Sequence, residues 1–313
     1  MIFMLSKYYY NQLNSTGKTV YDALVAGLEQ RQKEIRVPEL PNEKVMAAIR
    51  MENPQLYFVD FSVWNVTEFM GIHKIAPTYM YDERQCDTIN AKAEALYRRF
   101  APLEGEYFLR KVHNYFVRTV SYDETEKGKT PLLENHSLVG SVMNGRGVCE
   151  GISFAFDFLL KRKGFDCTVV TGMCEGEGHM WNVVCLNGNN YHIDVTNDIT
   201  QTGSCFDKPC YFYYLITDDA MRKTATFEER FQCTQTADNP FYLSGKMFGD
   251  DGLRRYLEGL PRDTRTVFFK YIGSKGEREV AQTVAERLLV QGGSLVSSVD
   301  KTGTIYYFTA MGG

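Results

Sequence analysis

One cysteine of this sequence, Cys149, stands where a reactive thiol is expected. It follows Gly147 and Val148 and precedes the helical pattern of residues 150–164, so it lies at a predicted junction of loop and helix. The unpaired backbone N–H groups and the dipole of a helix start favour an anion, and the thiolate is the reactive form of cysteine. Gly151 leaves room beside the sulfur. The backbone N–H of Cys149 could then donate a hydrogen bond to an oxyanion.

A β-hairpin is predicted downstream of the cysteine. Residues 179–186 have a strand pattern, and Asn187-Gly188 is typical of a two-residue hairpin turn. The return strand is expected over residues 191–196. A two-residue loop fixes which residues face each other across the hairpin, whereas a three-residue loop would turn the two strands' side chains to opposite faces.

The hairpin register predicts a histidine–aspartate pair. With a two-residue loop, Trp181 lies opposite Asp194, so His179 and Asp194 are diagonal neighbours on one face. Diagonal positions lie about 7–8 Å apart at the backbone, which an Asp–His hydrogen bond can span. The carboxylate would fix the imidazole tautomer, and the imidazole would act as the base for the thiol. His192 points to the same face and competes for the role of base, whereas His136 is expected to be an ordinary solvated or packed residue.

The three segments that carry these residues resemble the transglutaminase-like superfamily, which shares a papain-like cysteine-peptidase fold. They are GRGVCEGISFAFDFLLKRKGFDCTVVTG, GHMWNVV and YHIDVTND, and the resemblance covers roughly residues 110–220. It implies a bacterial-type member in which Cys149 is the nucleophile, His179 the base and Asp194 the orienting residue. It also favours His179 over His192 as the base.

The chain departs from the family at one position. Many members carry an aromatic residue directly after the Asp-x-Thr of the last motif, and this chain has Asn197 there. The departure concerns the shape of the cleft and leaves the three catalytic candidates intact. The residues expected beside the oxyanion or along the cleft are Gly147, Val148, Trp181 and Asn197.

The element pattern predicts an α+β fold. Its papain-like or transglutaminase-like core would pack the helix that carries Cys149 on an antiparallel sheet, with a helical N-terminal region and a small C-terminal α/β module. The expected domains are residues 1–100, 101–237 and 238–313. Helices are predicted over residues 17–35, 42–52, 87–103, 105–120, 150–164, 250–258 and 276–290. Strands are predicted over residues 167–171, 241–248 and 266–272, with a final strand pair over 294–309.

Composition narrows the classes of partner. The 313 residues are 44% hydrophobic and 24% charged, which is ordinary globular usage, and the net charge of -4 gives no basic field for nucleic acid or anionic lipid. No stretch approaches the roughly 18 apolar residues of a membrane helix, and the N-terminal apolar run is too short for a signal peptide. We therefore expect a cytoplasmic protein that acts on a peptide or protein, with no nucleic-acid or membrane partner. The oligomeric state stays open.

The cysteines add little beyond Cys149. No CxxC pair occurs, which argues against a zinc ribbon or a thioredoxin-like site, and we expect neither a metal nor a cofactor. Most are expected to be small buried side chains, although disulfides stay open if the protein is exported. The eight are Cys86, Cys149, Cys167, Cys174, Cys185, Cys205, Cys210 and Cys233.

Three functions fit this sequence. The first is a thiol hydrolase of peptide or isopeptide bonds, and the second is a transglutaminase that transfers a glutamine acyl group to an amine. Both pass through an acyl-enzyme and differ only in the acceptor. No EF-hand-like acidic loop suggests a calcium-dependent transglutaminase, and the hydrolase is preferred. The third is a non-catalytic module that binds peptide or glycan in the same cleft.

Overall fold

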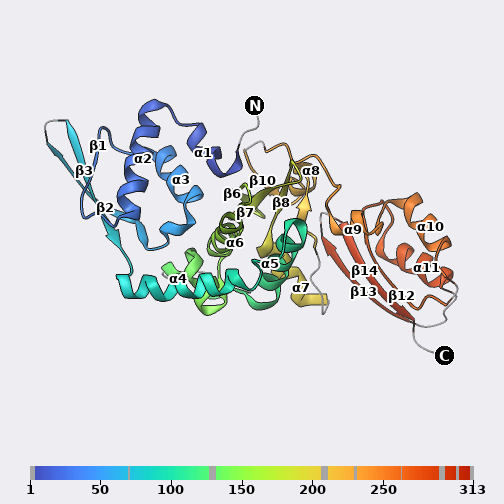
Figure 1. Cartoon of the computed structure of the whole chain (residues 1–313). Helices are drawn as coiled ribbons and strands as arrows, with labels where there is room; N and C mark the ends of the chain where they lie inside the picture. Colours follow the sequence, from blue (N-terminus) through green and yellow to red (C-terminus); the bar gives the residue numbers. More distant parts are fainter. Residues whose placement is uncertain are drawn as a thin grey trace. The chain divides into compact units, whose positions relative to one another are not determined.

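The computed structural model, whose helices and strands are labelled in Figure 1, divides into two compact units. One consists of Met1–Thr171 and His179–Gly188, and the other of Gly172–Gly178 and Asn189–Gly313. The structure describes residues 4–69, 71–126, 132–205, 211–228, 231–261, 263–288, 293–300 and 303–310.

The first unit begins with helices packed on a three-stranded antiparallel sheet of strand order β1-β3-β2. Asparagines cap two of the helices: Asn14 Oδ1 accepts the Gly17 N–H at 2.7 Å, and Asn42 Oδ1 accepts the Val45 N–H at 3.1 Å. Helices and strands share one apolar core around Leu24. The elements are η1 (Leu5–Lys7), α1 (Tyr8–Asn11), α2 (Ser15–Glu29), β1 (Ile35–Val37), α3 (Glu43–Glu52), η2 (Pro54–Leu56), β2 (Val59–Phe69) and β3 (Ile72–Tyr79).

The prediction of a helix over 17–35 is wrong at its end, because α2 stops at Glu29 and Ile35 belongs to β1. The stop is a Schellman motif: the Gln32 N–H donates to the Gly27 carbonyl at 2.9 Å. Arg31 takes the left-handed position with φ 54°. Because glycine usually fills that position, the sequence carried no signal for the stop.

Two long helices, α4 (Glu83–Arg98) and α5 (Gly105–Thr119), precede the central helix of the first unit, α6 (Cys149–Lys163). Phe116 of α5 meets Phe156 of α6 edge to face, with ring centroids 5.8 Å apart. Gly164 ends α6 in the left-handed conformation, as predicted. Between α5 and α6 lie β4 (Ser121–Tyr122), η3 (Glu124–Glu126), η4 (Leu133–His136), η5 (Gly140–Asn144) and β5 (Arg146–Gly147).

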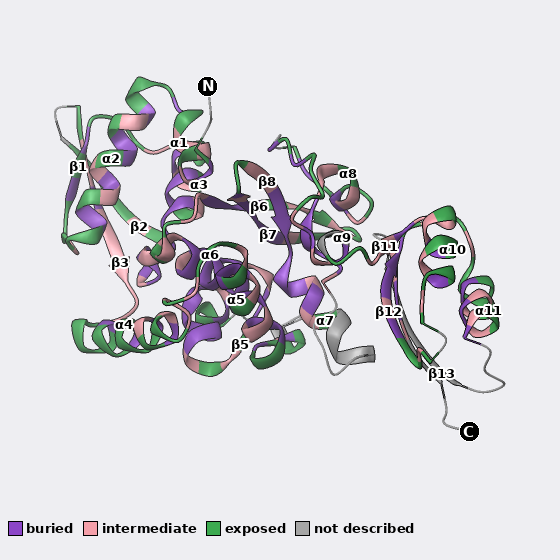
Figure 2. Ribbon diagram, turned by 45° about the vertical axis from the view of Figure 1, so that its right-hand side comes forward, coloured by how far each residue is buried: buried purple, intermediate pink, exposed green. Residues whose placement is uncertain are grey.

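Helix α6 packs on the strands that follow it, β6 (Cys167–Cys174) and β7 (Glu177–Leu186), which are largely buried (Figure 2). The Ser153 hydroxyl donates to the Met180 carbonyl at 3.0 Å, and the Asn182 amide donates to the Ser153 carbonyl at 3.1 Å. The fold is therefore the predicted α+β arrangement, with the cysteine-bearing helix packed against strands of an antiparallel sheet.

The predicted hairpin turn is confirmed, but its return strand is shorter than predicted. Strand β7 ends at Leu186 and β8 (Asn189–Ile193) follows after two residues. Asn187 has φ 51° and Gly188 has φ 79°, as a type I′ turn requires. Asp194 is not a strand residue, because the chain enters α7 (Val195–Cys205) there, a helix that the sequence analysis missed.

The second unit pairs β8 with β9 (Tyr214–Ile216), and β10 (Ala225–Thr226) with the end of β6, both antiparallel. Its later part is a four-stranded sheet of order β11-β12-β14-β13, and apolar side chains of two helices cover that sheet. The remaining elements are α8 (Asp218–Met221), α9 (Pro240–Leu243), β11 (Met247–Phe248), α10 (Asp250–Glu258), β12 (Thr266–Tyr271), α11 (Glu277–Arg287), β13 (Gly293–Asp300) and β14 (Gly303–Ala310).

The predicted strand over 241–248 is wrong. Its first half is the short helix α9, and only Met247–Phe248 pairs as a strand. Asn239 explains the difference, because its side-chain oxygen accepts the Phe241 N–H at 3.0 Å, while Pro240 opens the helix. The other predicted elements of this part of the chain, including the final strand pair, are confirmed.

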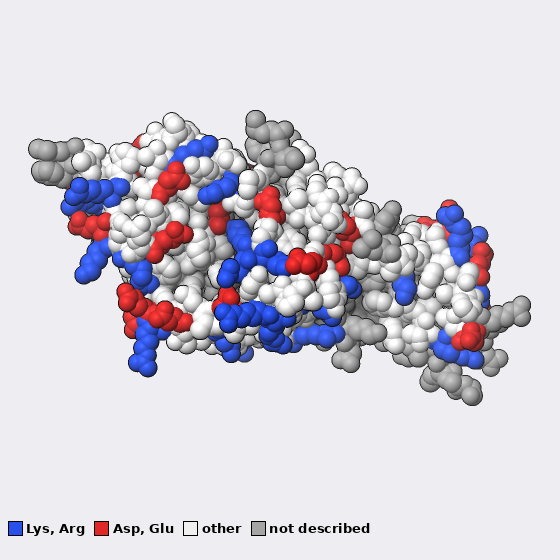
Figure 3. All heavy atoms as spheres, viewed as in Figure 1, with Lys and Arg blue, Asp and Glu red and all other residues white. Residues whose placement is uncertain are grey.

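Two surface properties bear on partners. On the face that Figure 3 shows, basic and acidic side chains are interspersed. Of the helices in the described part of the chain, none has both the length and the apolar character needed to cross a bilayer.

Candidate active site

Cys149 is the first residue of α6, as predicted, and directly follows the cap residue Val148. Val148 supplies no side-chain cap, so the helix start keeps the electrostatic character that favours an anion. Cys149 is a free, half-buried thiol that packs against the apolar cluster of Phe154, Val169 and Met180.

The loop before Cys149 is held by backbone pairing. Gly147 lies in β5, which pairs in parallel with β4, and the Asp123 N–H donates to the Gly147 carbonyl at 3.0 Å. The Val148 N–H donates to the Asn135 carbonyl at 3.2 Å. These bonds fix the direction in which the chain enters α6.

Gly151 is needed for the close approach of two backbone carbonyls. A Cβ atom at Gly151 would lie 2.1 Å from the Asn135 carbonyl oxygen and 2.7 Å from the Ser137 carbonyl oxygen. The first turn of α6 and the segment after Leu132 therefore approach each other more closely than any side chain permits.

His179 belongs to the first unit with Cys149 and is half-buried at the start of β7. Its ring stacks on Trp181 with centroids 5.8 Å apart. The next residue, Met180, accepts the hydrogen bond from Ser153, which lies one turn after Cys149, and Met180 also belongs to the cluster that Cys149 joins. Hydrogen bonds of Ser153 with Met180 and Asn182, together with the apolar cluster, thus join the start of α6 to β7.

Asp194 belongs to the second unit, and its predicted pairing with His179 stays a prediction. It is fully buried at the start of α7, where Oδ1 accepts the Asn197 N–H at 3.0 Å. Oδ2 accepts the Asn197 side-chain amide at 2.8 Å. Asn197, which the sequence analysis placed along the cleft, therefore orients the Asp194 carboxylate, a role the analysis missed.

His192, the competing base, has a carboxylate partner elsewhere. Its Nε2 lies 2.8 Å from Asp218 Oδ1, and the ring is fully buried against Phe227 and Phe231. Burial lowers the pKa of His192 and outweighs the opposite effect of Asp218. Burial would raise the pKa of Asp218, but the hydrogen bonds from His192 and the Cys233 N–H lower it overall. The lowered pKa of His192 and the lowered pKa of Asp218 both fit a neutral imidazole that donates a hydrogen bond to an ionised carboxylate.

In the part of the chain that the structure describes, one group of side chains could hold a metal ion: His192, Asp218 and Cys233, with ligand atoms within 4.8 Å of one another. Asp218 is hydrogen-bonded both to His192 and to the Cys233 N–H, the latter at 3.1 Å. These two bonds explain why the three side chains lie close together without a metal ion. Burial raises the pKa of Cys233, which favours the thiol over the thiolate that binds metal.

Three residues beside the cysteine were missed by the sequence analysis. Glu150 forms an ion pair with the Arg50 guanidinium, and its Oε2 lies 2.8 Å from His136 Nδ1. His136, expected to be ordinary, is thus tied to the residue next to Cys149. Glu150 could have been noticed as an acidic residue in the first turn of a predicted helix, where the helix dipole favours negative charge. Nothing in the sequence indicates that Arg50, a hundred positions away, pairs with it.

The comparison with protein families agrees with the resemblance seen in the sequence. Residues 95–195 match the transglutaminase-like superfamily. The matched segment includes Cys149, His179 and Asp194. None of the curated proteins compared with the chain matches it.

Several solved structures are similar over part of the chain. A proposed cysteine protease from Cytophaga hutchinsonii is 12% identical with a TM-score of 0.29, over 43% of this chain and 61% of that one. A TGase is 11% identical with a TM-score of 0.36, over 82% of this chain and 67% of that one. Menin, whose structure reveals the binding site for the Mixed Lineage Leukemia protein, is 16% identical with a TM-score of 0.30, over 57% of this chain and 35% of menin. Structural similarities with TM-scores this low do not support any conclusion about activity. The chain spans about three fifths of the length of the first of these proteins.

Gly151→Ala tests the close approach at the helix start. The added Cβ would collide with two backbone carbonyls, so we expect the free energy of unfolding to fall by about 2–3 kcal/mol despite the better helix propensity of alanine. Gly178→Ala is the matched control, because its Cβ would meet nothing within 4 Å. Urea unfolding measures both. Equal stabilities of the two variants would refute the packing argument.

Proposed function

We propose that the protein is a thiol-dependent acyl-transfer enzyme in which Cys149 is the nucleophile, His179 the base and Asp194 the orienting carboxylate. The observation that carries the proposal is the attachment of the α6 start, with its uncapped N-terminus and free thiol, to the start of the strand that bears His179. The match of residues 95–195 to the transglutaminase-like superfamily supports it.

The proposed reaction forms and breaks one thioester. The Cys149 thiolate attacks the substrate carbonyl carbon, a C–S bond forms, and the backbone N–H of Cys149 donates to the oxyanion. The C–N bond then breaks, and the His179 imidazolium gives its proton to the leaving amine. In the second half, His179 takes a proton from water as the water oxygen attacks the thioester carbon, and the C–S bond then breaks. This step releases the carboxylic acid and restores the Cys149 thiolate and the His179 imidazolium.

Asp194 would hold the His179 tautomer and stabilise the imidazolium. Its two hydrogen bonds from Asn197 keep the carboxylate in one orientation within the second unit. Val148, Gly147 and Trp181 would border the reacting group, because the first two set the entry into α6 and Trp181 stacks on the base.

We favour hydrolysis of peptide or isopeptide bonds over transfer to an amine, with a peptide or protein as substrate. Both reactions use the same thioester, so the acceptor alone separates them. We place the enzyme in the cytoplasm. The free thiols of Cys86, Cys149, Cys167, Cys185 and Cys233 support a reducing compartment. Cys210 and the side chain of Cys205 lie outside the described residues.

Cys149→Ala should lower the rate of peptide hydrolysis by about a thousandfold or more, because no other group replaces the nucleophile. Cys185→Ala is the control. It removes another partly buried thiol, one whose pKa burial raises, and should leave the rate unchanged. A steady-state assay on purified protein measures both. Retained activity in Cys149→Ala would refute the assignment of the nucleophile.

The same assay with a fluorescent primary amine identifies the acceptor. A hydrolase gives mainly free acid, and labelled peptide stays a minor product even at millimolar amine. Amine incorporation that outpaces hydrolysis would establish the transferase instead. A wild-type protein that binds peptides and turns over none of them would favour a binding module.

Asp194→Asn tests the orienting carboxylate without removing the helix cap, because asparagine caps helices as well as aspartate does. We expect kcat to fall by about 10²–10⁴-fold with little change in melting temperature. Asp194→Ala should also cost about 1 kcal/mol of stability, since it loses the cap. Full activity of Asp194→Asn would exclude a catalytic role for the carboxylate.

A further inference from the structure

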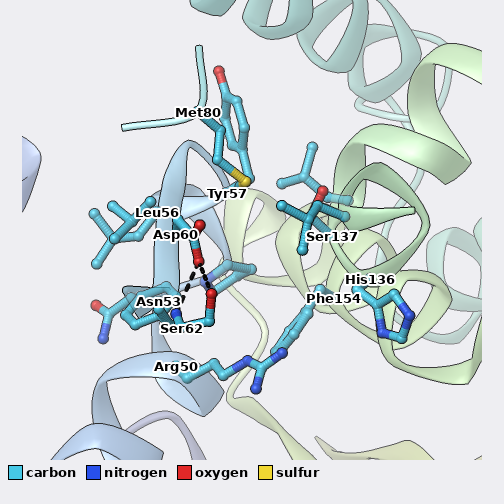
Figure 4. Close-up of a pocket in the computed structure, with 15 residues that line it drawn as sticks. Arg50, Asn53, Leu56, Tyr57, Asp60, Ser62, Met80, His136, Ser137 and Phe154 are labelled. Atoms are coloured by element: carbon cyan, nitrogen blue, oxygen red, sulfur yellow. Dashed lines mark hydrogen bonds between the residues drawn. The ribbon is translucent and has the colours of Figure 1, made fainter. Parts of the chain in front are cut away.

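A cavity of about 180 Å³ lies in the first unit, beside the first turns of α6 (Figure 4). One wall comes from the end of α3, the segment that joins it to β2, the start of β2 and Met80. The other comes from Leu133, residues 136–138 and Phe154. Large apolar side chains that line it include Leu56, Tyr57, Phe61, Met80, Leu138 and Phe154.

Two contacts connect this cavity to Cys149. Phe154, which lines it, belongs to the apolar cluster that Cys149 joins. Glu150, the residue after the cysteine, binds both Arg50 and His136, and both of these also line the cavity. The cavity therefore lies on the flank of the helix start and not in a remote part of the unit.

Polar groups of the lining already have protein partners. Arg50 is paired with Glu150, and Asp60 accepts the Ser62 N–H at 2.8 Å. The Tyr57 hydroxyl donates to Asn90 Oδ1 at 2.9 Å. Since burying a further polar group without a partner costs free energy, the cavity favours an apolar occupant.

Size and distance narrow the occupant further. An apolar cavity of about 150 Å³ accepts benzene, so this one has room for a phenyl ring or a branched aliphatic group. Phe154 lies five residues after Cys149, or about 7.5 Å along the helix. An extended peptide covers that distance in about two residues. A peptide acylating Cys149 could thus place a nearby side chain in the cavity.

We propose that this cavity is a specificity pocket for an aromatic or branched aliphatic side chain of the acyl-donor peptide, two or three residues from the reacting carbonyl. The inference rests on the proposed function. It assigns the choice of substrate to residues of the N-terminal part of the chain, chiefly Tyr57, Ser62 and Met80, which lie outside the matched family segment.

Ser62→Trp tests the pocket, because Ser62 is an exposed lining residue on β2 and an indole there would occupy the cavity. The substrates are two series of peptides that carry phenylalanine or alanine at each of the three positions before the scissile bond. We expect kcat/KM of wild type to be at least about tenfold higher for phenylalanine at one position, and this preference to vanish in Ser62→Trp.

Val63→Trp is the matched control, since Val63 is the next residue of β2, is 54% exposed and does not line the cavity. It should keep the wild-type preference. Equal kcat/KM for both peptide series in wild type, or an unchanged preference in Ser62→Trp, would refute the proposal that the cavity is a specificity pocket. Neither result would affect the proposed function. Lack of turnover of every peptide, together with failure of a small acylating probe to label Cys149, would instead overturn the proposed function and the pocket with it.

Discussion

The close packing at the start of α6 is the constraint on which the candidate site depends. Gly151 lets the carbonyls of Asn135 and Ser137 approach the first helical turn, and Ser153 binds the strand carbonyl beside His179. A helix start fixed on two sides can hold a thiol in one place, whereas a fraying terminus could not. Both contacts are buried, so they persist where water would otherwise compete.

The N-terminal part of the chain is built onto this same helix. The Glu52 carboxylate accepts the N–H groups of Tyr9 and Tyr10 at 2.8 and 3.0 Å, and the Tyr21 hydroxyl at 3.1 Å. Lys161 of α6 donates to the Glu52 backbone carbonyl at 2.9 Å and pairs with Asp157. The residues that form the apolar pocket are therefore held to the helix that carries Cys149 at both of its ends, through Glu150 and through Lys161.

The features that could be predicted from the sequence are those that depend on a few neighbouring residues. A glycine stop at Gly164 and an Asn187-Gly188 turn have local signatures, and both are present. The sequence could not predict that Asp194 would leave the strand to cap a helix, because the cap depends on Asn197 turning back toward the carboxylate. The Arg50–Glu150 pair was likewise out of reach, since it depends on how distant segments pack.

The central claim is that a thioester forms on Cys149, and trapping that thioester tests it most directly. Wild-type protein would be mixed with an activated ester of a phenylalanine peptide, quenched with acid within the first turnover, and mapped by mass spectrometry. The account predicts one acyl group per chain on the peptide that contains Cys149, removed by neutral hydroxylamine. Product formation with no acyl group on Cys149, or acylation spread over other cysteines such as Cys185, would contradict it.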